Sequence, residues 1–209
     1  MHNIFFKIKE AGERITHKKG GYLFYRGDHG DSFYIIEKGH VELSIFDLNG
    51  EKHIISELQR NEFFGHIEAF TNGIHPTNAY ATAGTEIICV TSQALKDFVL
   101  FNSDKSLEVL NFLCQTIHHN FDKIEDELVL DAYQKVSKKI YELGQKEASE
   151  NLFINQKRIS EFLALSERTT NVSLRKLREN GVISTDRSRI HILDNNKLKQ
   201  QFQDHRRFL

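Results

Sequence analysis

The 209-residue sequence predicts an α+β protein: an N-terminal β jelly-roll barrel, a long central helix and a C-terminal winged helix-turn-helix. Short apolar runs separated by glycine turns fill the first hundred residues, as in antiparallel barrels. From Leu107 to Leu128 the apolar residues alternate between spacings of three and four, as in coiled-coil helices. The last part holds two capped helices and a short hairpin. The predicted domains are therefore residues 1–103, 104–130 and 131–209.

The barrel region begins with an expected helix over residues 1–18, because Ile4, Phe5, Ile8 and Ala11 share one helical face. Glycine-punctuated strands should follow it. They are expected at residues 22–25, 32–37, 40–47 and 51–58, with two more within residues 78–91 around Gly84.

Two further elements complete this region. Asn49 and Gly50 should form a hairpin turn, because both residues tolerate a positive φ. A helix over residues 91–101 should follow the last strand. Its inward residues are expected to be Leu95, Phe98 and Val99.

Composition excludes several classes of protein. No run approaches eighteen consecutive apolar residues, and the N-terminus lacks an apolar core with a cleavage site, so neither a membrane span nor a signal peptide is expected. Cys89 and Cys114 lie in apolar surroundings and are interpreted as buried thiols of a reducing compartment, which indicates a cytoplasmic protein. Two cysteines in one chain cannot hold an iron–sulfur cluster that usually needs four.

Charge is distributed unevenly along the chain. Residues 151–209 contain 12 Lys and Arg against 6 Asp and Glu, whereas the other 150 residues contain 16 against 23. An acidic front and a basic end suggest that only the C-terminal part meets a polyanion.

The apolar seam of the central helix predicts that two copies of the chain pair along it. The alternative is a long helix packed inside its own domain, since short heptad patterns also occur in bundles. The predicted dimer interface consists of Leu107, Leu110, Cys114, Ile117, Phe121, Ile124 and Leu128.

The C-terminal part is typical of a winged helix-turn-helix. A helix over residues 131–143 should stop at Gly144. Asn155 should cap the next helix, and Ser166 should cap a second one that Gly181 ends. That second helix is expected over residues 167–179, and a hairpin of residues 182–185 and 189–193 would form the wing.

Helical spacing places Glu167, Arg168, Asn171 and Val172 on the outward face of the second helix. In a DNA major groove, Arg168 suits guanine, Asn171 suits adenine, Glu167 suits cytosine and Val172 suits a thymine methyl. The alternative is a solvated charged face. Residues that continue this face or suit phosphates are Ser166, Thr169, Arg175, Arg178, Arg187 and Arg189.

The segment GYLFYRGDHGDSFYIIEKGHVELSIFDLNGEKHIISELQRNEFFGHIEAF resembles the sensor barrel of the Crp–Fnr superfamily of bacterial transcription regulators. The order of barrel, dimer helix and DNA-binding module also matches that superfamily over nearly the whole chain. The matching landmarks are Gly27, Asp28, the Tyr34–Gly39 strand and turn, Asn49-Gly50 and Phe64-Gly65.

This resemblance implies a homodimeric regulator, not an enzyme, that binds double-stranded DNA at an inverted repeat. RNA polymerase and a small-molecule effector are the other implied partners. Many relatives begin the recognition helix with Ser-Arg-Glu-Thr-Val-x-Arg. Here Glu167 and Arg168 stand in swapped order and Val172 takes the place of the later arginine, so the half-site should differ.

The segment that binds cyclic nucleotides in relatives departs from their pattern. The glutamate position there is His66, and the arginine and serine positions fall on Thr77 and Asn78. No arginine lies between Arg60 and Arg158 to neutralise a cyclic phosphate, which argues against cyclic AMP. The resemblance places the effector pocket at Gly65, His66, Glu68, Thr77, Asn78 and Asn120.

His66 has three interpretations: a polar residue in an emptied pocket, a contact to another effector, or a haem ligand as in related gas sensors. A barrel metalloenzyme of the cupin type is a further alternative, because His53, His66, Glu68 and His75 are loosely available. The usual His-x-His-then-Glu spacing is absent, however, and no metal ligand set is predicted.

Overall fold

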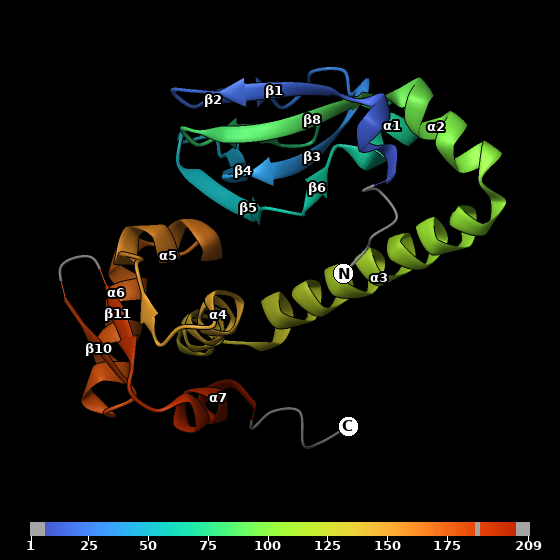
Figure 1. Ribbon diagram of the computed structural model, residues 1–209. Helices are drawn as coiled ribbons and strands as arrows, with labels where there is room; N and C mark the ends of the chain where they lie inside the picture. Colours follow the sequence, from blue (N-terminus) through green and yellow to red (C-terminus); the bar gives the residue numbers. More distant parts are fainter. Residues whose placement is uncertain (1–6, 187–188, 204–209) are drawn as a thin grey trace. The chain divides into compact units, whose positions relative to one another are not determined.

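The computed structural model describes residues 7–186 and 189–203 (Figure 1). The chain forms two compact units, of which the first ends at His119 and the second begins at Asn120. In the described part of the chain, no helix has the length and apolar character needed to cross a membrane.

The first unit contains two four-stranded antiparallel sheets whose facing sides enclose a core (Figure 1). One sheet has the order β1-β8-β3-β6, from Glu13–His17, Thr85–Thr91, Ser32–Lys38 and Phe63–Phe64. The other has the order β2-β7-β4-β5, from Gly21–Phe24, Asn78–Ala81, His40–Phe46 and Lys52–Gln59. The core between them consists of Phe24, Ile36, Val41, Phe64, Ala79, Ala81 and Ile87. The predicted barrel-like, antiparallel architecture is confirmed.

Helical segments cover the outer face of the first sheet. They are the 3-10 helix η1 (Lys7–Ala11), α1 (His66–Thr71), α2 (Ser92–Phe101) and the first turns of α3 (Ser103–Val129). The hydroxyl of Thr91 accepts the Ala94 N–H and caps α2, where the helix was predicted. Side chains buried on this face are Ile8, Phe33, Ile35, Ala69, Ile88, Val90, Leu95 and Val109.

The predicted helix over residues 1–18 is wrong for the residues that the structure describes. Only η1 is helical, and Glu13–His17 instead forms β1, which pairs antiparallel with β8. Gly12 permits this pairing, because a Cβ there would lie 2.3 Å from Cγ2 of Ile88. Pairing with a strand distant in sequence overrides the local periodicity. Ile4 and Phe5 lie outside the described residues.

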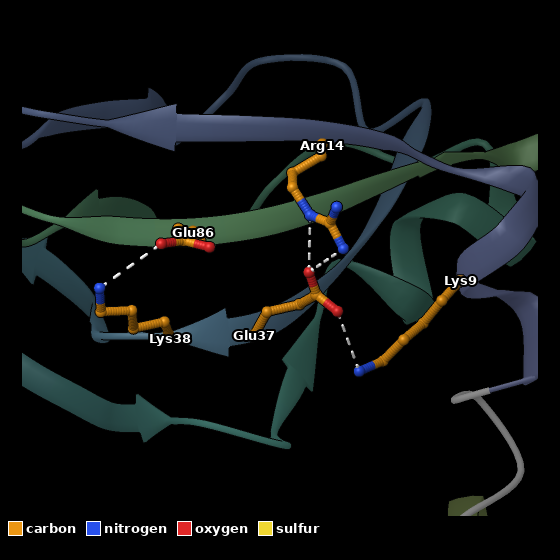
Figure 2. A network of polar contacts seen from close by, with 5 residues as sticks. All are labelled: Lys9, Arg14, Glu37, Lys38 and Glu86. Carbon is orange, nitrogen blue, oxygen red and sulfur yellow. Dashed lines mark hydrogen bonds and ion pairs between the residues drawn. The ribbon is translucent and has the colours of Figure 1, made fainter.

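Charged side chains of η1, β1, β3 and β8 pair with one another (Figure 2). The carboxylate of Glu37 accepts hydrogen bonds from Nε of Arg14 at 2.8 Å and from Nζ of Lys9 at 3.4 Å. Lys38 pairs with Glu86 at 3.5 Å across the strands β3 and β8. Partial burial opposes ionisation of Glu37, but the two cations outweigh it and hold the Glu37 pKa below its usual value.

Strands β4 and β5 form the predicted hairpin, whose turn contains Asn49 and Gly50. Gly50 has a φ of 80°, whereas Asn49 does not adopt a positive φ. The N–H of Asp47 donates to the Glu51 carbonyl at 3.0 Å, and the Asp47 carboxylate accepts the N–H groups of Asn49 and Glu51. The aspartate therefore organises the turn through its side chain.

The second unit is a winged helix-turn-helix, as predicted. Its three-stranded antiparallel sheet has the order β10-β11-β9. Its elements are α4 (Ala132–Glu147), β9 (Asn151–Leu152), α5 (Gln156–Leu163), α6 (Glu167–Glu179), β10 (Ile183–Thr185), β11 (Ile190–Ile192) and α7 (Asn195–Gln203). Its core consists of Val136, Ile140, Leu143, Leu152, Ile159, Leu174, Leu177, Val182, Ile183, Ile190, Ile192 and Leu198.

Gly144 does not end the first helix of this unit, contrary to the prediction. Helix α4 continues to Glu147 and ends at Ala148, which adopts the left-handed conformation with a φ of 49°. A Cβ at Gly144 would lie 2.7 Å from Cδ1 of Ile192. The absence of a side chain at Gly144 therefore lets α4 pack closely against β11.

Candidate nucleic-acid interface and effector-binding segment

Helix α6 presents the outward face that helical spacing predicts. Glu167, Arg168 and Val172 are exposed and Asn171 is half-buried. Val172 is 58% exposed, so its methyl groups are accessible on this face. The opposite face is buried and consists of Thr170, Ser173, Leu174 and Leu177.

The start of α6 is fixed by its cap. The Ser166 hydroxyl oxygen accepts the Thr169 N–H at 3.1 Å, and the hydroxyls of these two residues lie 2.8 Å apart. The preceding turn ends α5 at Ala164, whose φ is 50°. The cap satisfies one of the N–H groups of the first helical turn that have no intrahelical partner. The remaining ones are available to an anion, as at other anion-binding helix ends.

The arginines predicted to continue the outward face or to contact phosphates have different surroundings. Nε of Arg175 lies 3.4 Å from a Glu179 carboxylate oxygen, one helical turn away. Arg178 donates to the Thr185 hydroxyl at 3.1 Å and so joins α6 to β10. The Arg189 guanidinium lies 4.3 Å from the ring centre of Phe153. Arg187 lies outside the described residues.

In the first unit, His66 is enclosed by aromatic rings. It opens α1 directly after Gly65, which has a φ of 76° and ends β6 with a sharp turn. The imidazole lies edge to face with Phe63 and Phe112, with ring centres 5.4 and 5.3 Å away. Neither ring nitrogen has a hydrogen-bond partner. Burial lowers the His66 pKa to about 4, so the imidazole is neutral at pH 7.

Glu68 lies on the same helix and faces His75. Both side chains are buried, and the Glu68 carboxylate lies 3.9 Å from Nδ1 of His75. The His75 ring stacks on Phe24 with ring centres 3.4 Å apart. Burial lowers the His75 pKa, while the carboxylates of Glu68, Asp28 and Asp31 act in the opposite direction.

The positions that resemble the phosphate clamp of relatives carry no cation. The side-chain oxygen of Asn78 accepts the Arg26 N–H at 3.0 Å, and its amide nitrogen donates to the Ser44 carbonyl at 3.1 Å. The buried Asn78 side chain thus joins β7 to β4 and to the chain after β2. Thr77 is half-buried, and Asn120 is exposed on α3 beyond the first unit.

Aromatic rings fill the space between the sheets near this segment. Tyr34 and Phe64 stack with ring centres 4.9 Å apart, and Phe24 lies 6.0 Å from Phe64. Burial, which is the largest cause, and nearby acidic groups raise the Tyr34 pKa to about 12. This part of the interior is therefore lined by aromatic rings.

The four residues named for the metalloenzyme alternative do not lie together as one group. His53 lies 3.3 Å from Asp47 at the β4–β5 turn, His75 faces Glu68, and His66 lies between phenyl rings. Among the described residues, no three His, Cys, Asp or Glu side chains form a group that could hold a metal ion. The candidate histidines are therefore distributed over separate environments.

Two groups of residues were missing from the sequence-based site. Phe63 and Phe112 enclose His66, and Phe153 contacts Arg189. A signal for Phe112 exists, because Val109, Phe112 and Leu113 form a second apolar stripe on the central helix at helical spacing. Phe153 carries no comparable signal, since its contact depends on strand pairing.

Comparison with known proteins relates both units to one family. Residues 14–100 match the cyclic nucleotide-binding domain, and residues 134–201 match the Crp-like helix-turn-helix domain. The CRP-like cAMP-activated global transcriptional regulator of Mycobacterium tuberculosis is 22% identical over 196 residues, which cover 90% of this chain and 87% of that protein. The anaerobic regulatory protein of Bacillus subtilis is 22% identical over 179 residues, covering 82% and 75%.

A solved structure has the same fold. The c-di-GMP responsive global regulator CLP of Xanthomonas campestris superposes with a TM-score of 0.77 at 13% identity, covering 91% of this chain and 98% of that chain. The matched domains, their order and the relatives agree with the motifs found in the sequence. The protein belongs to the Crp–Fnr family of DNA-binding transcription regulators and is not an enzyme.

Proposed function

We propose that this regulator acts as a homodimer that reads an inverted-repeat operator through two copies of α6. We further propose that an effector other than cyclic AMP controls it through the barrel. The exposed apolar seam of α3 is the observation that most strongly supports the dimer. A two-fold dimer presents its recognition helices to successive major grooves, roughly 34 Å apart, and so reads a palindromic site.

The seam supports pairing because α3 has two apolar stripes with different surroundings. Val109, Phe112 and Leu113 pack on the barrel. The second stripe is exposed, and a contiguous exposed apolar stripe of this length is typical of a protein interface. It consists of Leu107, Leu110, Cys114, Ile117, Phe121, Ile124 and Leu128, with exposed fractions of 54–82% for the six apart from Cys114, which is also exposed.

The proposed dimer is tested by sedimentation of the full chain. We expect a dimer for the wild type and a monomer for Ile117→Glu, because a charge would be buried in the seam. The matched control is Ile55→Glu, which is 47% exposed on β5 and is not one of the seam residues. A monomeric wild type would contradict the proposal.

The segment that corresponds to the cyclic-nucleotide-binding residues of relatives supports an effector other than cyclic AMP. In this segment the phosphate clamp is replaced by Thr77 and by Asn78, whose amide is engaged by the backbone. A buried phosphate without a cation would lose more hydration free energy than these groups return. Isothermal titration with cyclic AMP should therefore give no binding heat, and a saturable heat would contradict this proposal.

Haem is the second candidate, and His66 favours it. Its two ring nitrogens are buried without partners and the imidazole is neutral, which is the form that binds metal. A neutral imidazole of this kind would be able to hold a haem iron through one ring nitrogen. Because Phe63 and Phe112 enclose the ring, haem binding requires those phenyl groups to move away from it.

An absorbance spectrum of protein purified from haem-replete cells tests this candidate. A Soret band that is lost in His66→Ala would support a haem-based sensor. A colourless protein that also takes up no added haem would leave other small molecules as effectors. RNA polymerase is the further partner that we propose for a regulator of this kind.

A further inference from the structure

We infer that Phe153, which lies between β9 and α5 and not on the recognition helix, is a positioning residue that holds Arg189 for a DNA phosphate. The inference deepens the proposed function and rests on the proposed contact of the wing with DNA. Phe153 is 72% exposed, so its ring contributes little to the core of the second unit. Its close neighbour is instead the Arg189 guanidinium, 4.3 Å from the ring centre.

Strand pairing brings these two residues together. Strands β9 and β11 are antiparallel, with Leu152 opposite Ile190 and Asn151 opposite His191. Continuing this register by one residue places Phe153 opposite Arg189. Side chains of directly opposed residues lie on the same face of a sheet, so the aromatic ring and the guanidinium meet without any change in the backbone.

The backbone around Arg189 is also held in place. The Asp186 N–H donates to the Arg189 carbonyl at 3.0 Å across the base of the wing. The neighbouring His191 ring has one nitrogen at the Asn151 side-chain oxygen and the other 3.5 Å from the Asp186 carboxylate. The β9–β11 pair thus fixes where the Arg189 side chain begins, and the Phe153 ring fixes where it ends.

Restricting this side chain has a physical consequence for binding. A free arginine loses much rotamer freedom when it docks on a phosphate, and a guanidinium already stacked on an aromatic ring loses less. Stacking leaves the edge of the guanidinium, with its N–H donors, open to a phosphate. Arg178, through its bond to Thr185, joins the same wing to the recognition helix.

The test measures affinity of the full chain for a mixed-sequence duplex of about 30 base pairs, three helical turns, by fluorescence anisotropy at several salt concentrations. A phosphate contact is independent of sequence, so no operator is needed. Phe153→Ala should weaken binding about two- to fivefold, the size expected for an exposed cation–π contact. Phe153→Leu should lose as much, whereas Phe153→Tyr should bind like the wild type.

A double variant separates positioning from a structural role. Phe153→Ala should cause no further loss in an Arg189→Ala background, because the group that it positions is gone. Leu193→Ala, a second exposed apolar side chain of this unit, is the control and should bind normally. Thermal unfolding should be alike for all variants.

Two results would overturn the inference. Normal binding by Phe153→Leu would show that the aromatic face is irrelevant, and additive losses in the double variant would make the role structural. If the wing does not contact DNA at all, the result differs: Arg189→Ala would then leave DNA affinity and its salt dependence unchanged. Arg175→Ala on α6 would still weaken binding in that case, and the proposed function would stand without the wing.

Discussion

His66 and Phe112 meet edge to face, with ring centres 5.3 Å apart, although they belong to different helices, α1 and α3. The contact links the segment that resembles an effector cassette to the helix that carries the proposed dimer seam. Both histidine nitrogens are enclosed without hydrogen bonds. A change of charge on His66 would therefore disturb the packing between these two helices.

Acidification should destabilise the protein through His66. Burial lowers its pKa from 6.5 to about 4, so the unfolded chain takes up a proton before the folded one does. The contribution of neutral His66 to the free energy of unfolding is present above the unfolded pKa of 6.5. It is lost as the pH falls towards the folded pKa. Between about pH 7.5 and about pH 5 the loss from this residue should be about 2 kcal/mol.

Urea denaturation of His66→Phe measures this loss. The variant keeps an aromatic ring but cannot titrate, so its free energy of unfolding should depend less on pH over that interval. His40→Gln, at an exposed position at the start of β4, should keep the wild-type dependence. Equal pH dependence in His66→Phe and wild type would contradict a buried neutral histidine.

Gly12→Ala should destabilise the first unit by about 1–3 kcal/mol through overpacking. A Cβ there would lie 2.3 Å from Cγ2 of Ile88 and 2.9 Å from Cγ2 of Val90, so β1 and β8 would have to separate. Denaturant midpoints measure the change. Gly73→Ala is the comparison and should lose less stability, because its Cβ would meet only the Thr71 hydroxyl, 2.9 Å away, which can rotate at the cost of its hydrogen bond to the Ile67 carbonyl.

Gly12 also shows what sequence patterns can and cannot predict here. The strands from residue 21 onward, except the two-residue β6, follow from apolar runs and glycine turns, which are local signals. Strand β1 does not, because it exists through pairing with β8, and six-residue α1 is too short for periodicity to reveal. Long-range pairing therefore determined where the prediction of the barrel failed.

The candidate sites divide in the same way. The outward face of α6 follows from helical spacing alone, so Arg168 and Val172 could be placed before the structure was known. The enclosure of His66 by Phe112 depends on how α3 packs on the barrel. The contact of Phe153 with Arg189 depends on the β9–β11 register. Neither packing nor register is encoded in a short motif.

Glu37→Gln should lower the free energy of unfolding by less than about 1 kcal/mol, because Arg14, the ion-pair partner of Glu37 on β1, is largely exposed. Its cationic neighbours lower the Glu37 pKa, more than offsetting the opposing effect of burial. The contribution is therefore present above the pKa of the unfolded carboxyl and is lost as pH falls through the folded pKa.

Chemical denaturation of wild type and Glu37→Gln at neutral and acidic pH checks this sign. The stability difference should shrink as the pH is lowered. Arg14→Gln should reproduce the effect because it removes the other partner of the same ion pair. A difference that grows on acidification would mean that the network does not favour the ionised carboxylate.

Arg168→Ala tests direct reading of bases by α6. Arg168 is exposed near the start of a helix whose cap fixes its orientation, so its guanidinium can reach a guanine edge. Selection of bound duplexes from a random pool should give an inverted repeat for the wild type. The variant should lose discrimination at one base pair of each half-site, about 1–3 kcal/mol. Arg175→Ala, the control on the same helix, should weaken binding to all sequences alike.

If Arg168→Ala instead behaved like Arg175→Ala, with unchanged base preference and a smaller salt dependence, Arg168 would be a phosphate contact. Specificity would then have to come from Glu167, Asn171 and Val172.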